Sequence, residues 1–317
     1  MTIHKIYLHR IISDTDLDTL KGHHLDDGYI HHLYNHDVDI YDSDTYELIL
    51  SFRKNRLKNS QTAWDNYRHL AVPSRGRGAS AGQIDPNSTY WKKRKLHNTK
   101  GYTTGYLKAD GTVSKMRVNN QVASIPIGYF EKISGPLKVN LPCRLSWHTA
   151  NDLDKFKGGI PYLQEVDRWY KKLNYKAYHH QKTRADKQPN YRIDNTAFST
   201  ITMNRNFRTA LHKDSGDYGG FAVLSVLEHG KYNGGLYMIP AYGIGINLRQ
   251  NDILVANVHE YHANTELWTT KEQDEYNASI PLEFKKDTRV GTIGLDLPFS
   301  RISFVSYLRE KLIDCDK

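Results

Sequence analysis

The chain has 317 residues, a formal net charge of +9 at pH 7 and 38% hydrophobic residues, with 22 tyrosines in total. This composition is typical of a folded domain, because tyrosine packs a ring while keeping a polar tip, and it excludes a chain disordered throughout. The longest apolar runs, such as 221–227, fall far short of the ~20 residues that a membrane span needs, so we expect no membrane contact.

Charge divides the first part of the chain in two. Residues 1–50 are acidic and rich in histidine, as in HHLDDGYIHHLYNHDVDIYDSD, and they open without a signal-like apolar run, which predicts a cytoplasmic protein. The stretch 53–117 is strongly basic and interleaved with tryptophan and tyrosine. A solvated surface has this pattern too, but cations between aromatic rings also suit contacts to nucleic acid, which we favour for this stretch.

Two features of the middle of the chain bear on its organisation. Residues 74–88, SRGRGASAGQIDPNS, indicate a glycine- and serine-rich loop that is either a flexible join or a substrate loop. Cys143 and Cys315 are the only cysteines, so we expect neither a disulfide framework nor a structural zinc cluster, which needs about four close ligands. Any metal would then be held by histidine and carboxylate.

The second half changes from a helical to a strand pattern. Tyr162, Val166, Trp169 and Leu173 recur at helical spacing, which predicts at least one amphipathic helix between about 161 and 182. Short strand-like runs follow, separated by Gly, Asn and Asp: TAFSTITMN, TALH, FAVLSVLEHG, GGLYMIPAYGIGINL, DILVANVHEYH and RISFVSYLR. Many short strands without helices between them indicate a sandwich or barrel. We predict a mainly β fold with flanking helices (α+β) around a double-stranded β-helix, that is, a cupin-like jelly roll.

Three regions follow from these patterns. Residues 1–60 are the acidic, histidine-rich region of unknown role, and 61–120 are the basic aromatic region with possible DNA contact. Residues 121–317 form the predicted jelly-roll domain with helices supporting it at its N-terminal side.

A pair of polar residues in TALHKDSGDYGG suggests a metal site. On a strand, His212 and Asp214 would point to the same face, because side chains at i and i+2 do. His262, before the small Ala263, would complete a two-histidine, one-carboxylate site of the kind that binds non-haem iron, with His259 as the runner-up ligand. The alternative is ordinary strand-end polarity. The same spacing at His24 and Asp26 lies in the acidic segment without a flanking strand, and we interpret it as surface.

The last strand-like run supplies a candidate anion site. Arg301, Ser303, Val305 and Tyr307 would share one face of that strand. An arginine and a serine so arranged can hold the distal carboxylate of 2-oxoglutarate by a bidentate ion pair and a hydroxyl hydrogen bond. The alternative for Arg301 is a paired surface arginine.

Taken together, the segment from about 196 to 309 resembles the oxygenase domain of the TET/JBP family of iron(II)- and 2-oxoglutarate-dependent dioxygenases, and viral and microbial members above all. The resemblance rests on the His-x-Asp pair, GGLYMIPAYGIGINL, the strand ending in HEYHAN, and Arg-x-Ser. It implies iron on His212, Asp214 and His262, and 2-oxoglutarate on Arg301 with Ser303 assisting. The step from His262 to Arg301 is longer than usual in the family, which leaves Arg289 as a substitute, but its neighbours lack the Arg-x-Ser pattern.

The resemblance also implies the chemistry. The cofactors would be Fe(II), 2-oxoglutarate and O₂, assisted by ascorbate, and the substrate would be the 5-methyl group of thymine or 5-methylcytosine in DNA. The target base would be flipped into the site. A viral relative would modify its own DNA in the host cytoplasm, or in the nucleus of a eukaryotic host, which favours thymine. The side chains that we expect to touch the base, with turn and strand-end hydrogen bonding as the alternative, are Asn204, Asn206, Arg208, Asn264, Arg75 and Arg77.

Two other classes of function stay open. The same metal site could hydroxylate a protein side chain, because the triad is shared across the superfamily. The chain could also be a nucleic-acid-binding jelly roll that has lost catalysis. A cupin without redox chemistry fits less well, since cupin sites more often use three histidines.

Overall fold

A broad β-sheet forms the centre of the protein. The computed structural model describes residues 3–70, 72–74, 77–87, 91, 96–114, 118–134, 140–281, 292–293 and 297–315. Neighbouring strands of this major sheet are antiparallel except that β1 runs parallel to β3 and β20 parallel to β8. Across the sheet the order is β1 (His4–Leu8), β3 (Val38–Asp42), β4 (Leu48–Arg53), β17 (Ile253–Asn257), β13 (Phe221–His229), β21 (Ser300–Tyr307), β12 (Thr200–Arg205), β8 (Gln121–Phe130) and β11 (Arg144–Leu145), with β5 (Pro73–Ser74) and β20 (Thr292–Ile293) also on β8.

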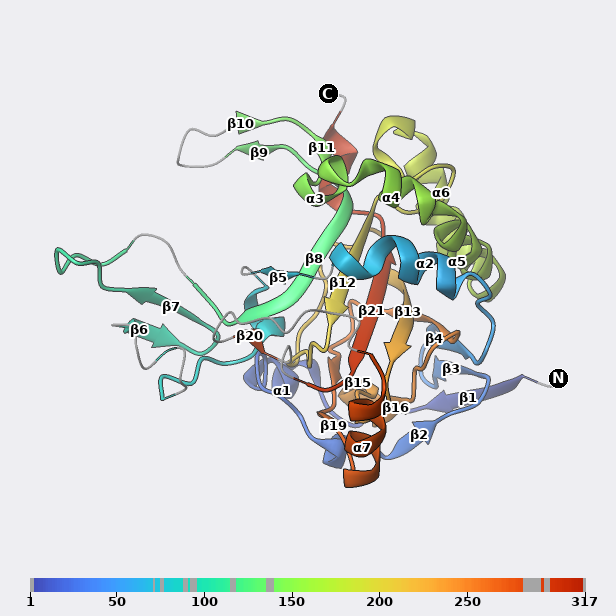
Figure 1. Cartoon of the computed structure of the whole chain (residues 1–317). Coiled ribbons are helices and arrows are strands. Elements are labelled where there is room, and N and C mark those ends of the chain that lie inside the picture. Colours follow the sequence, from blue (N-terminus) through green and yellow to red (C-terminus); the bar gives the residue numbers. More distant parts are fainter. Residues whose placement is uncertain are drawn as a thin grey trace.

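A smaller sheet faces the major one. It contains β18 (Ala263–Asn264), β15 (Tyr237–Ile239), β16 (Ile244–Ile246) and β2 (His32–Tyr34) in that order. Two facing sheets of mainly antiparallel strands are the predicted double-stranded β-helix, and the helices of residues 60–67 and 147–186 gather on the opposite side of the major sheet (Figure 1). The fold class predicted from the sequence is therefore confirmed.

Alternation along the strands separates two cores. On β13, Leu224 and Val226 face the small sheet, whereas Val223 and Leu227 face the helices. Each face is apolar because both are covered, so the central strands show continuous hydrophobic runs. On β21, Ile302 and Phe304 pack under the helices, which turns the odd-numbered residues of that strand into the space between the sheets.

Helices cover the outer face of the major sheet. The predicted helical region contains two helices, because Asn174 leaves helical geometry (φ −143°) and its side chain caps the second helix by accepting from the Ala177 N–H. The helices on this face are α2 (Ser60–Tyr67), α3 (Trp147–Asn151), α4 (Leu153–Gly158), α5 (Ile160–Leu173) and α6 (Tyr175–Asp186). By contrast, α1 (Asp14–Thr19) packs Leu17 into the core between the sheets, and α7 (Lys271–Ser279) follows β19. No helix among the described residues is long and apolar enough to cross a bilayer.

Three two-stranded sheets complete the fold. One, β6 (Leu96–Lys100) with β7 (Thr103–Tyr106), stands away from the body as an arm (Figure 1). The others are β9 (Ile133–Ser134) with β10 (Asn140–Leu141), and β14 (Asn233–Gly234) with β19 (Leu267–Trp268).

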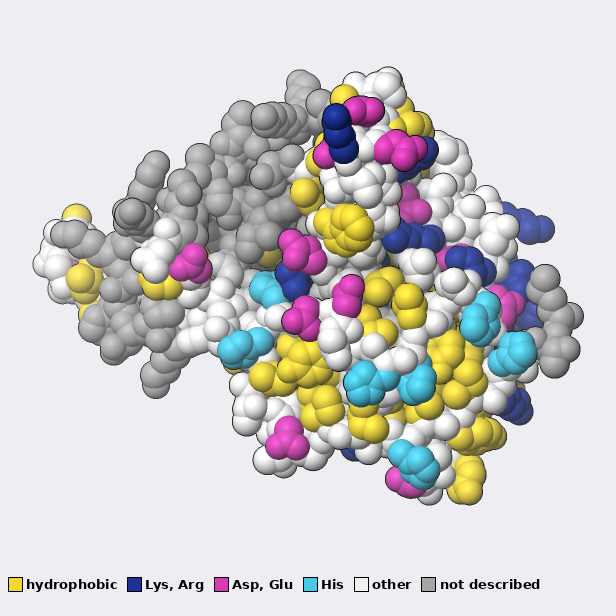
Figure 2. All heavy atoms as spheres, turned by 90° about the horizontal axis from the view of Figure 1, so that it is seen from below, with side chains coloured by type: hydrophobic (Ala, Val, Ile, Leu, Met, Phe, Trp, Pro, Cys, Tyr) yellow, Lys and Arg dark blue, Asp and Glu magenta, His cyan; other side chains and the backbone are white. Residues whose placement is uncertain are grey.

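The first 53 residues belong to the same β-sandwich as the second half. Strands β1, β3 and β4 extend the major sheet beyond β17, and β2 pairs with β16 of the small sheet. Val38, Ile40 and Phe52 are fully buried in the core between the sheets. Most of the acidic and histidine side chains of this segment are at least partly exposed, whereas Asp39 and Asp42 are buried. Histidine and hydrophobic side chains intermingle on the face seen from below (Figure 2), the side on which Figure 1 places β2 and α7.

The expectation for the cysteines was wrong. Cys143 and Cys315, 172 positions apart in sequence, form a disulfide that ties the C-terminal turn Glu310–Asp314 (η6) to the residues before β11. Composition alone shows neither that two lone cysteines meet nor that the chain end returns to β11. One cross-link closing so long a loop restricts the unfolded chain strongly.

Candidate active site

His212, Asp214 and His262 come together between the two sheets. One ligand atom from each lies within 4.8 Å of the others, and these residues are the only such His, Cys, Asp or Glu group in the described part of the chain. The Asp214 carboxylate oxygens lie 3.6 Å from the Nε2 atoms of His212 and His262. Two imidazoles and one carboxylate converging on one point are suited to hold a divalent metal ion.

The backbone fixes this convergence. His212 and His262 exchange N–H···O bonds of 3.1 and 3.0 Å, and the Asp214 N–H donates to the Val258 carbonyl at 2.9 Å. The predicted strand through TALH is absent: His212 makes only this isolated bridge, in an irregular segment. The pairing with the segment after β17, rather than strand alternation, turns His212 and Asp214 the same way.

Hydrogen bonds also set the histidine tautomers. Nδ1 of His212 lies 2.8 Å from the Ala210 carbonyl, and Nδ1 of His262 lies 2.9 Å from the Glu260 carbonyl. Since a carbonyl only accepts, each Nδ1 carries the proton, and each Nε2 keeps its lone pair for the cluster. The runner-up, His259, is turned away, because its Nε2 donates to the Asp217 carbonyl at 3.0 Å.

Charge within the cluster favours the forms that bind metal. Burial, with a smaller effect of His262, lowers the pKa of His212 to about 4, so its imidazole is neutral at neutral pH. Burial alone would raise the pKa of Asp214, but its interactions with His212 and His262, and with the Arg77 guanidinium beyond them, hold it below its ordinary value. A neutral imidazole and an ionised carboxylate are the ligand forms that a divalent cation requires.

Arg301 lies in the same cavity as the cluster. The cavity is also lined by Ser303, Val305 and Tyr307, so the face predicted for this strand does point to one place. Asn206, with φ of +48°, holds Arg301 by accepting from its N–H at 2.7 Å and donating to its carbonyl at 2.8 Å. The Arg301 Nε is buried without a hydrogen-bond partner. Beneath it, Gly235 has φ of +65°, and a Cβ there would lie 2.6 Å from Leu267 and 3.3 Å from that Nε.

Other buried donors near Arg301 and the cluster also lack partners. The Tyr237 hydroxyl is buried without a hydrogen bond, and its ring centre lies 5.5 Å from that of His262. Nη2 of Arg77 is buried and unpartnered as well, and both residues line the cavity. A buried donor without an acceptor costs about 1–3 kcal/mol, so these groups fit an anionic ligand that would satisfy them.

Asp217 is a further cavity residue that the sequence reasoning missed. It is 6% exposed, and its Oδ2 has no hydrogen-bond partner. Burial and then the charge of Asp214 raise the pKa of Asp217 well above its ordinary value, while Arg309 opposes the shift. The pattern HKDSGD gave a weak indication of this cavity residue, because Asp217 lies only three residues after Asp214 in the same loop. Tyr237 had no signal beyond strand alternation.

The C-terminal segment holds the loop that carries Asp214 and Asp217. The Tyr218 N–H donates to the Leu308 carbonyl at 2.8 Å, and the Glu310 N–H donates to the Gly216 carbonyl at 3.0 Å. Arg309 in turn makes a bidentate pair with Glu131 at 2.7 and 2.9 Å. The disulfide at Cys315 therefore anchors a segment that touches the candidate site.

The predicted base contacts fall into three groups. Asn204 and Asn264 line the cavity, where Asn204 donates to Ser303 at 3.4 Å and Asn264 accepts from Thr209 at 2.7 Å. Asn206 and Arg208 point elsewhere, since Asn206 holds Arg301 and Arg208 donates to the Leu25 carbonyl at 2.8 Å. The remaining candidates are Arg77, which lines the cavity, and Arg75, which lies outside the described residues, as does the substitute Arg289.

Comparisons with known proteins agree with this geometry. The family Tet_JBP, described as the oxygenase domain of the 2OGFeDO superfamily, matches residues 126–286, just over half of the chain. Thymine dioxygenase JBP1 of Trypanosoma brucei brucei is 35% identical over 154 residues, 48% of this chain and 17% of that protein. The bifunctional helicase and thymine dioxygenase JBP2 of Leishmania tarentolae is 33% identical over 142 residues, 44% of this chain and 12% of that protein.

These matches therefore span less than a fifth of the length of either relative. Among solved structures, NgTET1 in complex with 5mC DNA aligns with a TM-score of 0.49 at 11% identity, over 89% of this chain and 80% of that one. Arg301 and Ser303 lie beyond the family match, on a strand between β13 and β12. The extent of the family match shows that the chain belongs to the TET/JBP family of iron(II)- and 2-oxoglutarate-dependent dioxygenases.

Proposed function

We propose that this chain hydroxylates the 5-methyl group of thymine in DNA. The observation that carries the proposal is a single cavity that is lined both by the His212, Asp214 and His262 cluster and by Arg301. Further polar side chains line the same cavity and are not required to bind the metal or 2-oxoglutarate, so they can contact a substrate. The matched relatives are named thymine dioxygenases, which supports thymine over 5-methylcytosine.

The residues present fit the two cofactors of the family. His212, Asp214 and His262 would hold Fe(II) through two neutral Nε2 atoms and one carboxylate. Arg301, Ser303 and the Tyr237 hydroxyl would hold 2-oxoglutarate, which supplies acceptors to the Arg301 Nε and to the Tyr237 hydroxyl, two donors that otherwise stay buried and unsatisfied. When bound, iron and 2-oxoglutarate supply the activation of O₂ by which a C–H bond is hydroxylated.

The remaining cavity residues suit a pyrimidine. Asp217 can accept from a ring N–H, Arg77 can donate to a carbonyl, and Tyr307 offers an aromatic ring beside them. Asn204 and Asn264 already bond to their neighbours, so they shape the wall. The protein's part is to orient the methyl group toward the metal ligands and to keep water away from it.

Such a cavity admits a base only when it leaves the duplex. The basic stretch 53–117, which includes the projecting β6–β7 arm (Figure 1), would contact the phosphates of the flanking DNA. If the affinity for DNA did not fall as the salt concentration rises, residues 53–117 would not bind phosphates.

The test is nucleoside mass spectrometry of DNA that contains both thymine and 5-methylcytosine. The protein is incubated with Fe(II), 2-oxoglutarate and ascorbate, beside Asp214→Ala and the matched variant His259→Ala. We expect 5-hydroxymethyluracil from the wild type and from His259→Ala, and none from Asp214→Ala.

Three other results would contradict the proposal. A hydroxylated product from 5-methylcytosine alone would show that 5-methylcytosine, and not thymine, is the substrate. No product from a chain that binds iron and 2-oxoglutarate would favour a protein side-chain hydroxylase. A chain that binds no iron would be a nucleic-acid-binding jelly roll without catalysis.

A further inference from the structure

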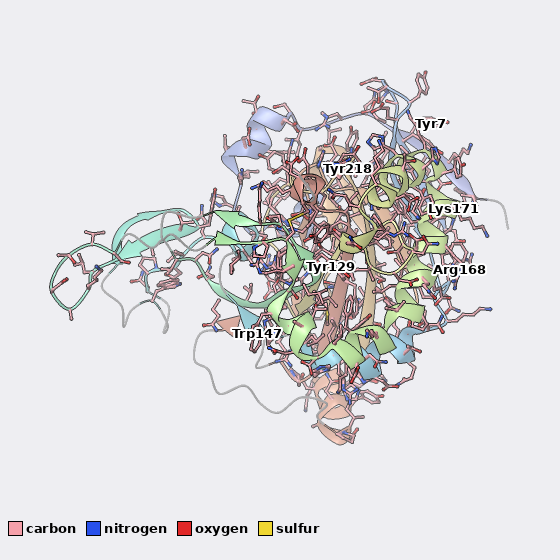
Figure 3. The ribbon with its side chains drawn as sticks, turned by 90° about the horizontal axis from the view of Figure 1, so that it is seen from above. Tyr7, Tyr129, Trp147, Arg168, Lys171 and Tyr218 are labelled. Atoms are coloured by element: carbon pink, nitrogen blue, oxygen red, sulfur yellow. A yellow bond between two sulfur atoms is a disulfide. The ribbon has the colours of Figure 1, made fainter. Side chains whose placement is uncertain are left out.

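The outward face of α5 and α6 is positively charged. Arg168, Lys171 and Lys172 of α5 and Lys176 of α6 are all exposed, and we call these four residues the helical cation face. Arg168 and Lys171 project from the helical rim of the molecule (Figure 3). No carboxylate of the described residues lies within 4.0 Å of any of the four side-chain nitrogens. The face therefore presents its charge to solvent.

The carboxylates of the same two helices are used elsewhere. Glu165 is 6% exposed and accepts the backbone N–H groups of Lys58 and Asn59, each at 2.9 Å. Asp167 is 8% exposed and accepts from the Ala197 N–H at 2.7 Å. Asp186, the third, pairs with Lys182 and Arg192. Nothing on α5 or α6 is thus left to neutralise the helical cation face.

This arrangement costs stability in the isolated protein. Arg168 faces Lys171 and Lys172 at i+3 and i+4, and like charges at these spacings destabilise a helix by about 0.2–0.5 kcal/mol each. Ring contacts hold two of the cations in place, since Lys172 Nζ lies 4.6 Å from the Trp169 ring centre and Lys171 Nζ lies 5.9 Å from that of Tyr178. A bound polyanion would relieve the repulsion.

The spacing suits a phosphate backbone. The four helical steps from Arg168 to Lys172 span about 6 Å, over which one DNA strand carries about two phosphates. At the corner between the helices, Tyr175 is 62% exposed and stacks on His179 with ring centres 5.8 Å apart. These groups add a polar aromatic surface beside the cations.

The helical cation face is remote from the candidate active site. The inner side of α5 packs Tyr162, Val166 and Tyr170 against the major sheet, and the cavity lies on the other side of that sheet. A helix layer and a sheet, each about 10 Å thick, therefore separate them. Phosphates on the face cannot belong to the nucleotide in the cavity.

We propose that the helical cation face is a second DNA-binding surface, which holds duplex DNA by its phosphates away from the modified base. The inference rests on the proposed function only in taking DNA as the polyanion. Because the contact needs DNA beyond the reacting nucleotide, it raises affinity for long duplexes and leaves the affinity for short ones unchanged.

The experiment compares the wild type with Arg168→Glu/Lys171→Glu/Lys172→Glu. The matched control is Lys21→Glu/Lys231→Glu/Lys271→Glu, which makes the same charge change at exposed lysines elsewhere. Binding to duplexes of about 10 bp and about 150 bp is measured over a salt series, and hydroxylation is measured on the short duplex. Circular dichroism checks folding, and a matched glutamine triple variant replaces the glutamates if they unfold the helix.

We expect the helix variant to bind the long duplex at least tenfold more weakly than the control does. The slope of log K against log salt should fall by about 3, from three lost phosphate contacts, while the short duplex binds and reacts as before. Equal losses in both variants, or equal losses on both duplexes, would overturn the inference, as would equally tight binding of polyglutamate or of RNA. If the wild type binds long DNA through this face but hydroxylates no DNA, the inference stands and the proposed function fails.

Discussion

Replacing Asp217 by asparagine should stabilise the metal-free protein at neutral pH. Asp217 is 6% exposed, and its Oδ2 has no hydrogen-bond partner. Burial and the neighbouring Asp214 raise its pKa, so a carboxyl group at this position is disfavoured in its charged form. Asparagine has nearly the same shape and no charge. Leaving a buried polar group unsatisfied costs about 1–3 kcal/mol, and more when that group is charged, so at a pH where Asp217 would ionise the gain should be about 2–6 °C in Tm at roughly 2 °C per kcal/mol.

The sign of the pH dependence follows from the raised pKa. A group whose folded pKa lies above its ordinary value of 3.8 contributes its full stability below that value, and this contribution is lost as pH rises through the folded pKa. Asparagine does not titrate, so the gain of Asp217→Asn should be small near pH 4 and should grow toward pH 8. The assay is thermal unfolding of metal-free wild type and variant across this range.

Two controls make the prediction sharper. Asp194→Asn makes the same chemical change where hydrogen bonds from the Asn195 backbone and from Gln164 lower the pKa, so it should be less stable than wild type above about pH 4, and this deficit should shrink as pH falls below that value. Adding Fe(II) should shrink the gain of Asp217→Asn, because the metal offsets the charge of Asp214. A lower Tm for Asp217→Asn, or a gain equal at every pH, would refute the reasoning.

Three further predictions concern the cofactor site and the disulfide. Arg301→Lys removes the two-pronged guanidinium, which costs about 1.5–3 kcal/mol of charge-assisted hydrogen bonding. Calorimetry should therefore show that 2-oxoglutarate binds the metal-loaded variant about 10- to 100-fold more weakly. Unchanged affinity would exclude the assigned role of Arg301. Tyr237→Phe deletes a hydroxyl that is buried without a partner, so the metal-free Tm should stay level or rise while 2-oxoglutarate affinity falls, and a clearly lower Tm would count against this. Cys143→Ser should lower the free energy of unfolding by about 2–4 kcal/mol in denaturant titrations, and a dithiol reductant should bring wild type to the same value and leave the variant unchanged.

Much of the candidate site could be predicted because it depends on local order. Arg301, Ser303, Val305 and Tyr307 alternate along one strand, and the period of two places them on one face in any sheet. His212 and Asp214 were found by spacing as well, although the predicted strand was wrong and a single bridge to His262 turns them together. The prediction that these two side chains point the same way was right despite the wrong strand, because a metal site requires only that both side chains point into the cavity.

Contacts between distant segments were decided by the tertiary structure. The pairing of Cys143 with Cys315 joins parts of the chain 172 residues apart, and no local pattern specifies it. Asn206 and Arg208 precede the His-x-Asp pair as plausible base contacts, yet one is used to hold Arg301 and the other to bind the Leu25 carbonyl. Which polar groups are left unsatisfied depends on every neighbour at once.

The sequence by itself determined the β-sandwich, the family and the residues that meet at the candidate metal site, because hydrophobic period and motif spacing are properties of short segments. Only the tertiary structure showed that Tyr237, Asp217 and Arg77 share the cavity and that the two carboxylates of α5, Glu165 and Asp167, turn inward. The physical reason is that burial and partner choice belong to the packed chain as a whole, in which a side chain's neighbours come from segments far away in sequence.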